Sequence, residues 1–149
     1  MMRVYTDGGC SGNPGPGGWG YVVLNAGTIR EDKGFELDTT NNRMELMAAI
    51  KALESIMAFT PVPVTVVTDS QYVKNGITAW IHKWKANDWV SSSGEAVKNV
   101  DLWQRLDQAR SPHAVEWVWV RGHNGDPGNE AADALANRGV DSVVGGARR

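Results

Sequence analysis

Over the first forty positions, hydrophobic and polar residues alternate as they do in strands. A strand is predicted over 2–9, where apolar positions alternate with polar ones until two glycines end the pattern. Residues 10–18 contain too much glycine and proline for regular structure. Residues 19–37 then predict two strands joined by a tight turn at 25–27. The chain is therefore expected to begin with three strands, the last two forming a hairpin.

A helical repeat replaces this alternation at 41–58, with Thr39 or Thr40 as the expected cap. At about 100° per residue, one broad arc of this helix is apolar. Its members are Leu46, Ala49, Ile50, Ala52, Leu53, Ile56 and Met57. Glu45 falls inside the same arc, although an unpaired buried charge is costly. Either a cation lies beside Glu45 or the helix prediction is wrong.

The rest of the chain alternates strands with helices. The elements expected are a strand at 64–70, a short helix from Ser70 to about Gly76, helices at 79–89 and 99–109, a strand at 114–120, and a helix from Asp126 to about residue 140. A hairpin followed by such crossovers indicates an α/β fold with one mixed sheet and helices on both faces. We expect one domain over 1–141 and a disordered tail at 142–149.

Composition narrows the class of protein. Hydrophobic residues make up 42% of the 149 residues and charged residues 21%, as in globular domains. No apolar run approaches the ~18 residues of a membrane span, and the N-terminus lacks the apolar core of a signal peptide. The single Cys10 excludes an internal disulfide, so a cytoplasmic protein without membrane contact is expected. The net charge of −2 does not indicate nucleic acid.

Four carboxylates are expected at one edge of the sheet. Asp7 and Asp69 each end a strand, where ligands of open α/β sheets bind. Glu45 and Asp133 lie near the starts of helices that can reach the same edge. Four such groups cannot all ionise close together without cations. Each has an ordinary alternative as a turn former, an ion-pair partner or a solvated helix residue, so topology alone leaves both a Mg²⁺ site and coincidence open.

Five motifs in order resemble type 1 ribonuclease H, in its bacterial cytosolic form. They are "YTDGGCSGNPGPGGWG", "TTNNRMELMAAIKAL", "VTDSQYVKNGI", "KNVDLWQRLD" and "VRGHNGDPGNEAADALA", and the likeness covers about residues 2–140. The resemblance implies a ribonuclease H-like, five-stranded mixed sheet flanked by helices. It also implies a Mg²⁺-dependent endonuclease that cleaves the RNA strand of RNA–DNA hybrids, leaving a 3′-hydroxyl and a 5′-phosphate. A monomer is expected.

The resemblance implies that the metal-binding carboxylates are Asp7, Glu45, Asp69 and Asp133. Carboxylates suit Mg²⁺, with Mn²⁺ as an alternative, and two ions about 4 Å apart suit an in-line displacement on phosphate. Asp7 is then expected to bind both ions, with Asp69 and Glu45 on one side and Asp133 on the other.

One histidine has an implied catalytic role. His123 matches the family's active-site loop histidine and would assist proton transfer or product release. Without the resemblance it would be an ordinary exposed loop residue. His82 and His113 have no such support, and both are expected at the surface.

The family's contacts to the RNA strand match five residues close to the carboxylates. They are Cys10, Asn13, Asn41, Asn42 and Gln71. Short polar groups there suit the minor groove and the 2′-hydroxyls that distinguish RNA from DNA. Turn or cap roles are the alternative for Asn13 and Asn41.

The DNA strand is expected to meet a second group. Trp80 and Trp84, at i and i+4, match a channel for the deoxyribose face, although such aromatic pairs are usually core residues. Thr40 and Asn99 match a DNA-phosphate pocket. An arginine that completes this pocket in some relatives has no counterpart, because Asp38 occupies that region.

The segment 81–99 departs from its bacterial relatives, which carry a dense basic cluster there. This chain has Lys83, Lys85 and Lys98, opposed by Asp88 and Glu95, so weaker hybrid affinity is expected. The sequence leaves three alternatives to a hybrid nuclease: an integrase- or resolvase-like DNA nuclease, a non-catalytic hybrid-binding protein and a Ca²⁺-binding structural domain. The complete carboxylate set and the absence of EF-hand spacing argue against the last two.

Overall fold

Five strands form one mixed sheet in the computed structural model, which describes residues 2–56, 62–122 and 125–147. The strands are β1 (Met2–Cys10), β2 (Gly15–Leu24), β3 (Thr28–Thr39), β4 (Pro63–Thr68) and β5 (Ala114–Trp119). Their order is β3-β2-β1-β4-β5. The first three pair antiparallel, whereas β1–β4 and β4–β5 pair parallel. The predicted mixed five-stranded sheet is therefore confirmed.

The predicted hairpin lies between β2 and β3, where the Asn25 N–H donates to the Gly27 carbonyl over 3.0 Å. The loop predicted at 10–18 is shorter than expected. β1 runs on to Cys10 and pairs there with Gly17 of β2, because glycine backbone can extend a ladder even where the side-chain pattern gives no strand.

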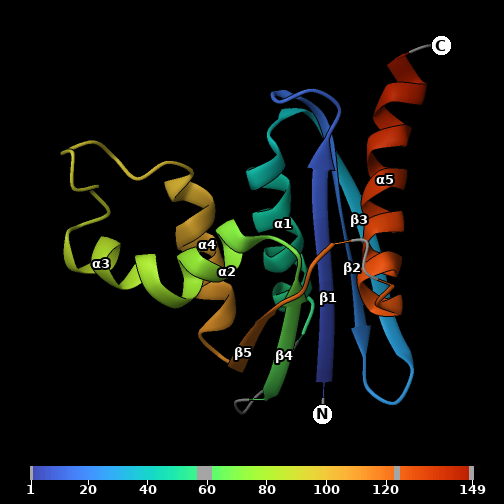
Figure 1. The fold of residues 1–149 in the computed structure, drawn as a ribbon, viewed down its shortest axis with the longest axis horizontal. Helices are drawn as coiled ribbons and strands as arrows, with labels where there is room; N and C mark the ends of the chain where they lie inside the picture. Colours follow the sequence, from blue (N-terminus) through green and yellow to red (C-terminus); the bar gives the residue numbers. More distant parts are fainter. Residues whose placement is uncertain (1, 57–61, 123–124, 148–149) are drawn as a thin grey trace.

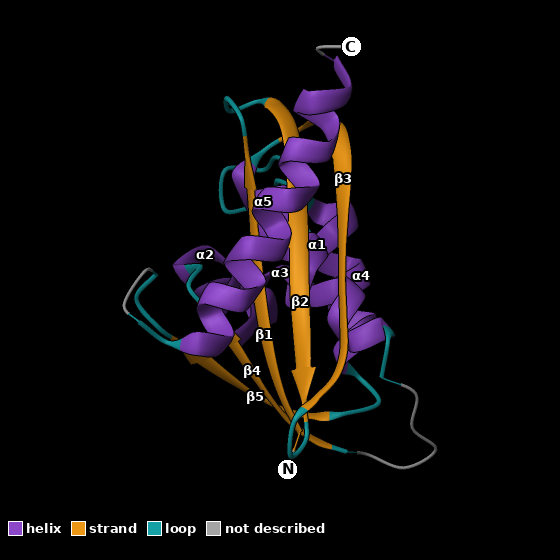
Figure 2. Cartoon of the chain, turned by 90° about the vertical axis from the view of Figure 1, so that its right-hand side faces the viewer, coloured by secondary structure: helices purple, strands orange, loops and turns teal. Residues whose placement is uncertain are grey.

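Helices cover both faces of the sheet. α1 (Asn41–Glu54) and α4 (Val100–Arg110) lie on one face, and α5 (Pro127–Ala147) lies on the other (Figures 1 and 2). β1 contributes alternately to the two cores: Val4 packs in the α1 cluster, whereas Tyr5 packs with Ala132 of α5. Within the described residues, none of the helices is both long and apolar enough to span a membrane.

One continuous helical segment follows β4. α2 (Gln71–Asn75) passes through a π-helical turn, η1 (Gly76–Trp80), into α3 (Ile81–Ala86). The predicted α-helix from Ser70 to about Gly76 is confirmed, but the chain stays helical beyond it through the π-helical turn. A Cβ on Gly76 would lie 2.5 Å from Cζ2 of the buried Trp103 ring, so this glycine permits close packing on α4.

The starts of two helices agree with prediction, whereas their ends do not. Thr40 caps α1, since its Oγ1 accepts from the Arg43 N–H over 3.3 Å. Asp126 caps α5 as predicted, accepting from the Gly128 N–H over 3.0 Å. α1 ends at Glu54, earlier than the expected 58, and α5 continues to Ala147, past the expected end near 140 and into the segment predicted to be disordered.

One histidine is misplaced by the sequence analysis. His113 precedes β5 and is buried, with only 9% of its surface exposed, so its predicted surface position is wrong. It lines a cavity together with Ile77 and Val115. His82 is exposed, as expected.

Candidate active site

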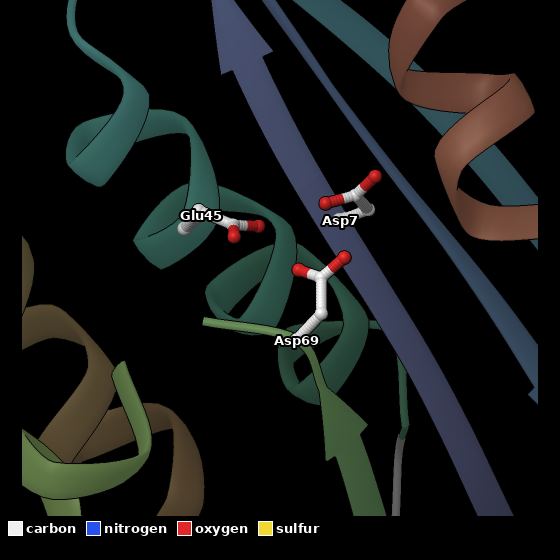
Figure 3. A group of neighbouring side chains, drawn as sticks. All are labelled: Asp7, Glu45 and Asp69. Atoms are coloured by element: carbon white, nitrogen blue, oxygen red, sulfur yellow. The ribbon is translucent and has the colours of Figure 1, made fainter. Parts of the chain in front are cut away.

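Three carboxylates from three elements meet toward the carboxyl ends of β1 and β4 (Figure 3). Asp7 comes from β1, Asp69 follows β4 directly, and Glu45 comes from the second turn of α1. One oxygen from each lies within 4.8 Å of the other two. Glu45 therefore points toward two strand-end carboxylates, as its position within the apolar arc of α1 predicted.

The register of the sheet places the two aspartates side by side. Thr6 of β1 is paired with Thr68 of β4 in the parallel ladder, so the next residues, Asp7 and Asp69, are neighbours. The chain turns away at once, because the Ser70 hydroxyl caps α2 by accepting from the Val73 N–H over 3.1 Å. The two Thr-Asp pairs thus lie side by side where the parallel β1–β4 ladder ends, although β1 itself continues to Cys10.

Close approach of α1 to β1 places Glu45 at the same point. Gly8 follows Asp7, and a Cβ there would lie 2.6 Å from the Glu45 backbone nitrogen and nearer still to the Met44 carbonyl. Any side chain at position 8 would push α1 outward. Glycine at this position therefore helps to set the distance between the helix and the strand carboxylates.

Burial and mutual repulsion make this cluster hard to ionise. Burial, then a hydrogen bond with Asp133 and the charges of Asp69 and Asp133, raise the pKa of Asp7 from 3.8 to about 9. Burial, followed by the charges of Asp7 and Asp69, holds the pKa of Glu45 well above its ordinary value. Neutralisation of the cluster at neutral pH thus requires either bound protons or cations.

Asp133 approaches the cluster from the other face of the sheet. It lies in the second turn of α5 and is close enough to Asp7 to raise the pKa of Asp7 through both a hydrogen bond and its charge. Its Oδ2 accepts from the Asn137 side chain over 3.3 Å. Asp7 therefore has carboxylates on both sides: Glu45 and Asp69 on one, Asp133 on the other.

The oxygens of this cluster fit a hard divalent cation. Glu45 Oε1 is fully buried and has no hydrogen-bond partner among the described residues. A buried acceptor without a donor is costly, and a cation beside it removes that cost. The donor set is all carboxylate oxygen, which Mg²⁺ and Mn²⁺ bind well. Asp7, Glu45 and Asp69 could hold such an ion, with Asp133 beside them.

His123, predicted to act in a loop beside the site, lies outside the described residues. The residue before it is placed: a Cβ on Gly122 would lie 2.9 Å from Asp69 Oδ2. The chain therefore passes directly against the Asp69 carboxylate as it leaves β5.

The predicted contacts to RNA form a hydrogen-bonded network beside the carboxylates. Asn41 Oδ1 accepts from the Cys10 N–H over 2.8 Å, and Asn13 Oδ1 accepts from the Asn41 N–H over 3.2 Å. The Cys10 thiol also contacts the Gly12 carbonyl. Asn13 and Asn41 thus have the local structural roles raised as alternatives, and both are exposed at the edge of the site, whereas Cys10 is half-buried.

The predicted RNA contacts and the predicted DNA-phosphate pocket share one cavity of about 330 Å³. Its lining consists of Asn13, Pro14, Thr40, Asn41, Asn42, Lys98 and Asn99. The structure thus brings together Thr40 and Asn99, which lie far apart in the sequence. Lys98 supplies a cation at this cavity, a role that the sequence analysis did not assign to it.

Arg43 was also missed. Its guanidinium donates to Asn99 Oδ1 over 3.3 Å and makes a two-point ion pair with Asp101, at 3.0 and 2.8 Å. Burial is partial, but the pair raises the pKa of Arg43 and lowers that of Asp101. Arg43 of α1 therefore contacts Asn99 of the predicted DNA-phosphate pocket, while its charge is paired with Asp101. The sequence did offer one signal for Arg43, since it lies three residues after Thr40, a predicted member of the same pocket.

Trp80 and Trp84 lie together as predicted, with ring centroids 6.0 Å apart. They line a cavity of about 280 Å³ with Lys83, Asn87, Val90 and Ser92. Trp84 also packs on the buried Trp103 ring at 5.2 Å, whereas Trp80 is 40% exposed. Trp84 therefore packs on the core, as aromatic pairs usually do, whereas Trp80 lies at the surface, where a substrate channel would need it.

Gln71 is the remaining predicted contact. It is exposed at the first position of α2, two residues after Asp69, and it borders a separate cavity formed with α2 and β5.

Comparison with known sequences gives one consistent result. The sequence model of the RNase H family matches residues 1–141. A ribonuclease H of Cupriavidus metallidurans is 59% identical over 142 residues, which cover 95% of this chain and 97% of that relative. One from Polaromonas naphthalenivorans is 58% identical over 144 residues, covering 95% of this chain and 88% of that relative.

Solved structures of RNase H proteins have the same fold as this chain. LC9-RNase H1, described as a type 1 RNase H with the type 2 active-site motif, superposes with a TM-score of 0.83 at 40% identity, covering 95% of this chain and 72% of that one. The N-terminal RNase H domain of a Mycobacterium tuberculosis protein gives 0.78 at 26%, covering 98% and 97%. LC11-RNase H1 in complex with RNA/DNA hybrid shares the fold, with a TM-score of 0.73 at 22% identity, covering 97% and 99%.

Proposed function

Because this chain belongs to the RNase H family, we propose that it is an endonuclease that hydrolyses the RNA strand of RNA–DNA hybrids. The products are a 3′-hydroxyl and a 5′-phosphate. One observation carries the proposal: Asp7, Glu45 and Asp69 bring oxygens within 4.8 Å of one another, and Glu45 Oε1 has no donor among the described residues. A protein that only binds hybrids has no need of such a costly cluster.

The carboxylates are assigned by their placement. Asp7 lies between the other members, so it is the group proposed to bind both ions. Asp69 and Glu45 complete one side, and Asp133 the other. When bound, two Mg²⁺ or Mn²⁺ ions activate the attacking water and stabilise the leaving 3′-oxygen. His123 assists proton transfer or product release.

The surrounding residues are assigned to the two strands of the hybrid. Cys10, Asn13, Asn41, Asn42 and Gln71 contact the RNA strand, where their backbone and amide groups suit the 2′-hydroxyls. Thr40 and Asn99 bind a DNA phosphate at the 330 Å³ cavity, with Lys98 adding positive charge. Trp80 and Trp84 contact a deoxyribose face.

The substitution Asp69→Asn tests the proposal, since it removes a ligand charge and keeps the shape. Cleavage of a labelled RNA–DNA hybrid in Mg²⁺ should fall by at least about 10³-fold, while hybrid binding in EDTA persists. Asp32→Asn on the exposed edge strand β3 is the matched control and should cleave like wild type. Appreciable Mg²⁺-dependent turnover in purified Asp69→Asn would rule the assignment out, and wild-type cleavage of duplex DNA in place of the hybrid would indicate a DNA nuclease.

A further inference from the structure

Trp119 lies against the active site but has no role in the function proposed above. It is the last residue of β5, and its indole N–H donates to the backbone carbonyl of Asp69 over 2.9 Å. The β4–β5 ladder ends just beyond, where the Val120 N–H donates to the Thr68 carbonyl over 2.9 Å. One edge of the indole is thus fixed beside a proposed metal ligand, while 37% of the residue stays exposed.

The exposed indole forms one wall of a small polar cavity. The cavity has a volume of about 220 Å³, and its other walls are Gln71, Lys74 and Asn75 of α2. No carboxylate of the described residues pairs with the Lys74 ammonium, and the side chains of Gln71 and Asn75 have no hydrogen-bond partner among the described residues. The cavity therefore offers an aromatic surface, one uncompensated cation and two amides.

This combination matches a nucleotide. A lysine ammonium binds a backbone phosphate, amides bind hydroxyls and base edges, and an aromatic face stacks on a base or covers a sugar. The indole is already held by its bond to Asp69, so little freedom is lost when it makes such a contact. Single-stranded nucleic acid is commonly bound by this pairing of positive charge with aromatic rings.

We propose that Trp119, Lys74, Asn75 and Gln71 form a subsite for one nucleotide of the RNA strand, next to the nucleotide that is cleaved. This rests on the proposed function. The RNA strand is chosen because the cavity adjoins Asp69 and shares Gln71 with the RNA contacts. The contacts assigned to DNA, Trp80 and Trp84, lie beyond the far end of α2. The subsite lengthens the track along the cleaved strand toward the β5 edge of the sheet.

Binding in EDTA separates the subsite from the chemistry. Fluorescence anisotropy of a labelled hybrid, measured from 50 to 300 mM salt, compares wild type with Lys74→Gln and Trp119→Leu. Lys74→Gln should weaken binding several-fold at low salt and make the salt slope shallower by about one unit, the loss of one phosphate contact. Trp119→Leu should weaken binding about tenfold, within the range for loss of one stacked base. Lys33→Gln, an equal charge change on the opposite edge strand β3, should bind like wild type.

A second measurement distinguishes recognition from folding. Circular dichroism spectra of all variants should match wild type, and Trp119→Phe, which keeps an aromatic face, should bind within about threefold of wild type. Cleavage in Mg²⁺ is then mapped on hybrids with one abasic ribonucleotide. Wild type should avoid one phosphate at a fixed offset from the abasic position, and Trp119→Leu should lose that avoidance.

Three results would overturn the subsite: wild-type affinity in both Lys74→Gln and Trp119→Leu, binding by Trp119→Phe as weak as by Trp119→Leu, or no fixed offset in wild type. Failure of the proposed function would look different, because wild-type protein would then not cleave intact hybrids in Mg²⁺.

Discussion

The Asp7 side chain shows how strongly the site depends on an external charge. Its pKa rises to about 9, so the folded protein binds a proton at pH values where the unfolded chain, with an ordinary carboxyl, does not. Stability therefore falls as pH rises from about 4 to about 9, because the unfolded chain ionises this carboxyl over that range whereas the folded state keeps it protonated. In EDTA, the free energy of unfolding in urea should drop across this range.

Asp7→Asn removes the group that titrates and should flatten this decline. At pH 8 without metal, the variant should be more stable than wild type by about 1–3 kcal/mol, the usual size of a large single-residue effect. Asp32→Asn, an exposed change, should keep the wild-type slope. Saturating Mg²⁺ should stabilise wild type and leave Asp7→Asn nearly unchanged, since a ligand stabilises only the state that binds it. An equal pH slope in Asp7→Asn would show that other groups destabilise the fold.

At the scale of elements, the distance between α1 and β1 is set by Gly8. In Gly8→Ala, the new Cβ would overlap the backbone at Met44 and Glu45, so α1 must move away from the strand. Overpacking of this kind costs about 1–3 kcal/mol. The shift should also displace Glu45, lowering kcat and weakening Mg²⁺ binding. Urea unfolding and a Mg²⁺ titration of activity would measure both effects.

Gly9→Ala provides the control for this prediction. A Cβ at position 9 would meet only Asn41 Oδ1, at an ordinary 3.8 Å. Its stability and Mg²⁺ dependence should stay close to wild type. If the two variants behaved alike, the loss would reflect alanine in a glycine-rich strand and not the position of α1.

At the scale of the whole molecule, the distribution of charge decides hybrid affinity. The net charge is −2, and the basic residues of segment 81–99 are partly neutralised. Lys85 is paired with Asp107 at 3.0 Å, which leaves Lys83 at the tryptophan cavity and Lys98 at the amide cavity. Fewer free cations release fewer counterions on binding, so the chain should show a high KM and a shallow salt dependence.

Adding charge to that segment should reverse both properties. In the triple variant Asp88→Asn, Ser92→Lys and Glu95→Lys, KM should fall at low salt and the salt slope should steepen by about one unit per new phosphate contact. Asn is used at position 88 because its φ of 52° suits Asn and strains longer side chains. The value of kcat should hardly change, since the segment supplies uniform binding. Steady-state kinetics at several salt concentrations would test this, and an unchanged KM would remove segment 81–99 from the substrate interface.

The amino-acid sequence by itself determined the elements and their order, because hydrophobic periodicity and capping residues act locally. The three N-terminal strands, the Asp126 cap and the inward-facing Glu45 all follow from neighbours a few positions away. The grouping of Asp7, Glu45 and Asp69 also followed, since a Thr-Asp pair lies on each strand where the parallel β1–β4 ladder ends. The same reasoning placed Asp133 near this edge of the sheet, whereas the resemblance to a known family supplied the substrate contacts, which no local pattern would have given.

Only the tertiary structure decided the features that depend on contacts distant in sequence. Gly76 ends α2 as predicted, but its close packing against the Trp103 ring and the π-helical turn that follows it depend on α4. His113 looked exposed, but in the folded chain only 9% of its surface is exposed. Arg43 reaches Asn99 across 56 positions, and Trp119 reaches Asp69 across 50. Periodicity reports which face of an element is apolar, whereas the partner that covers that face is fixed only when the sheet and helices pack together.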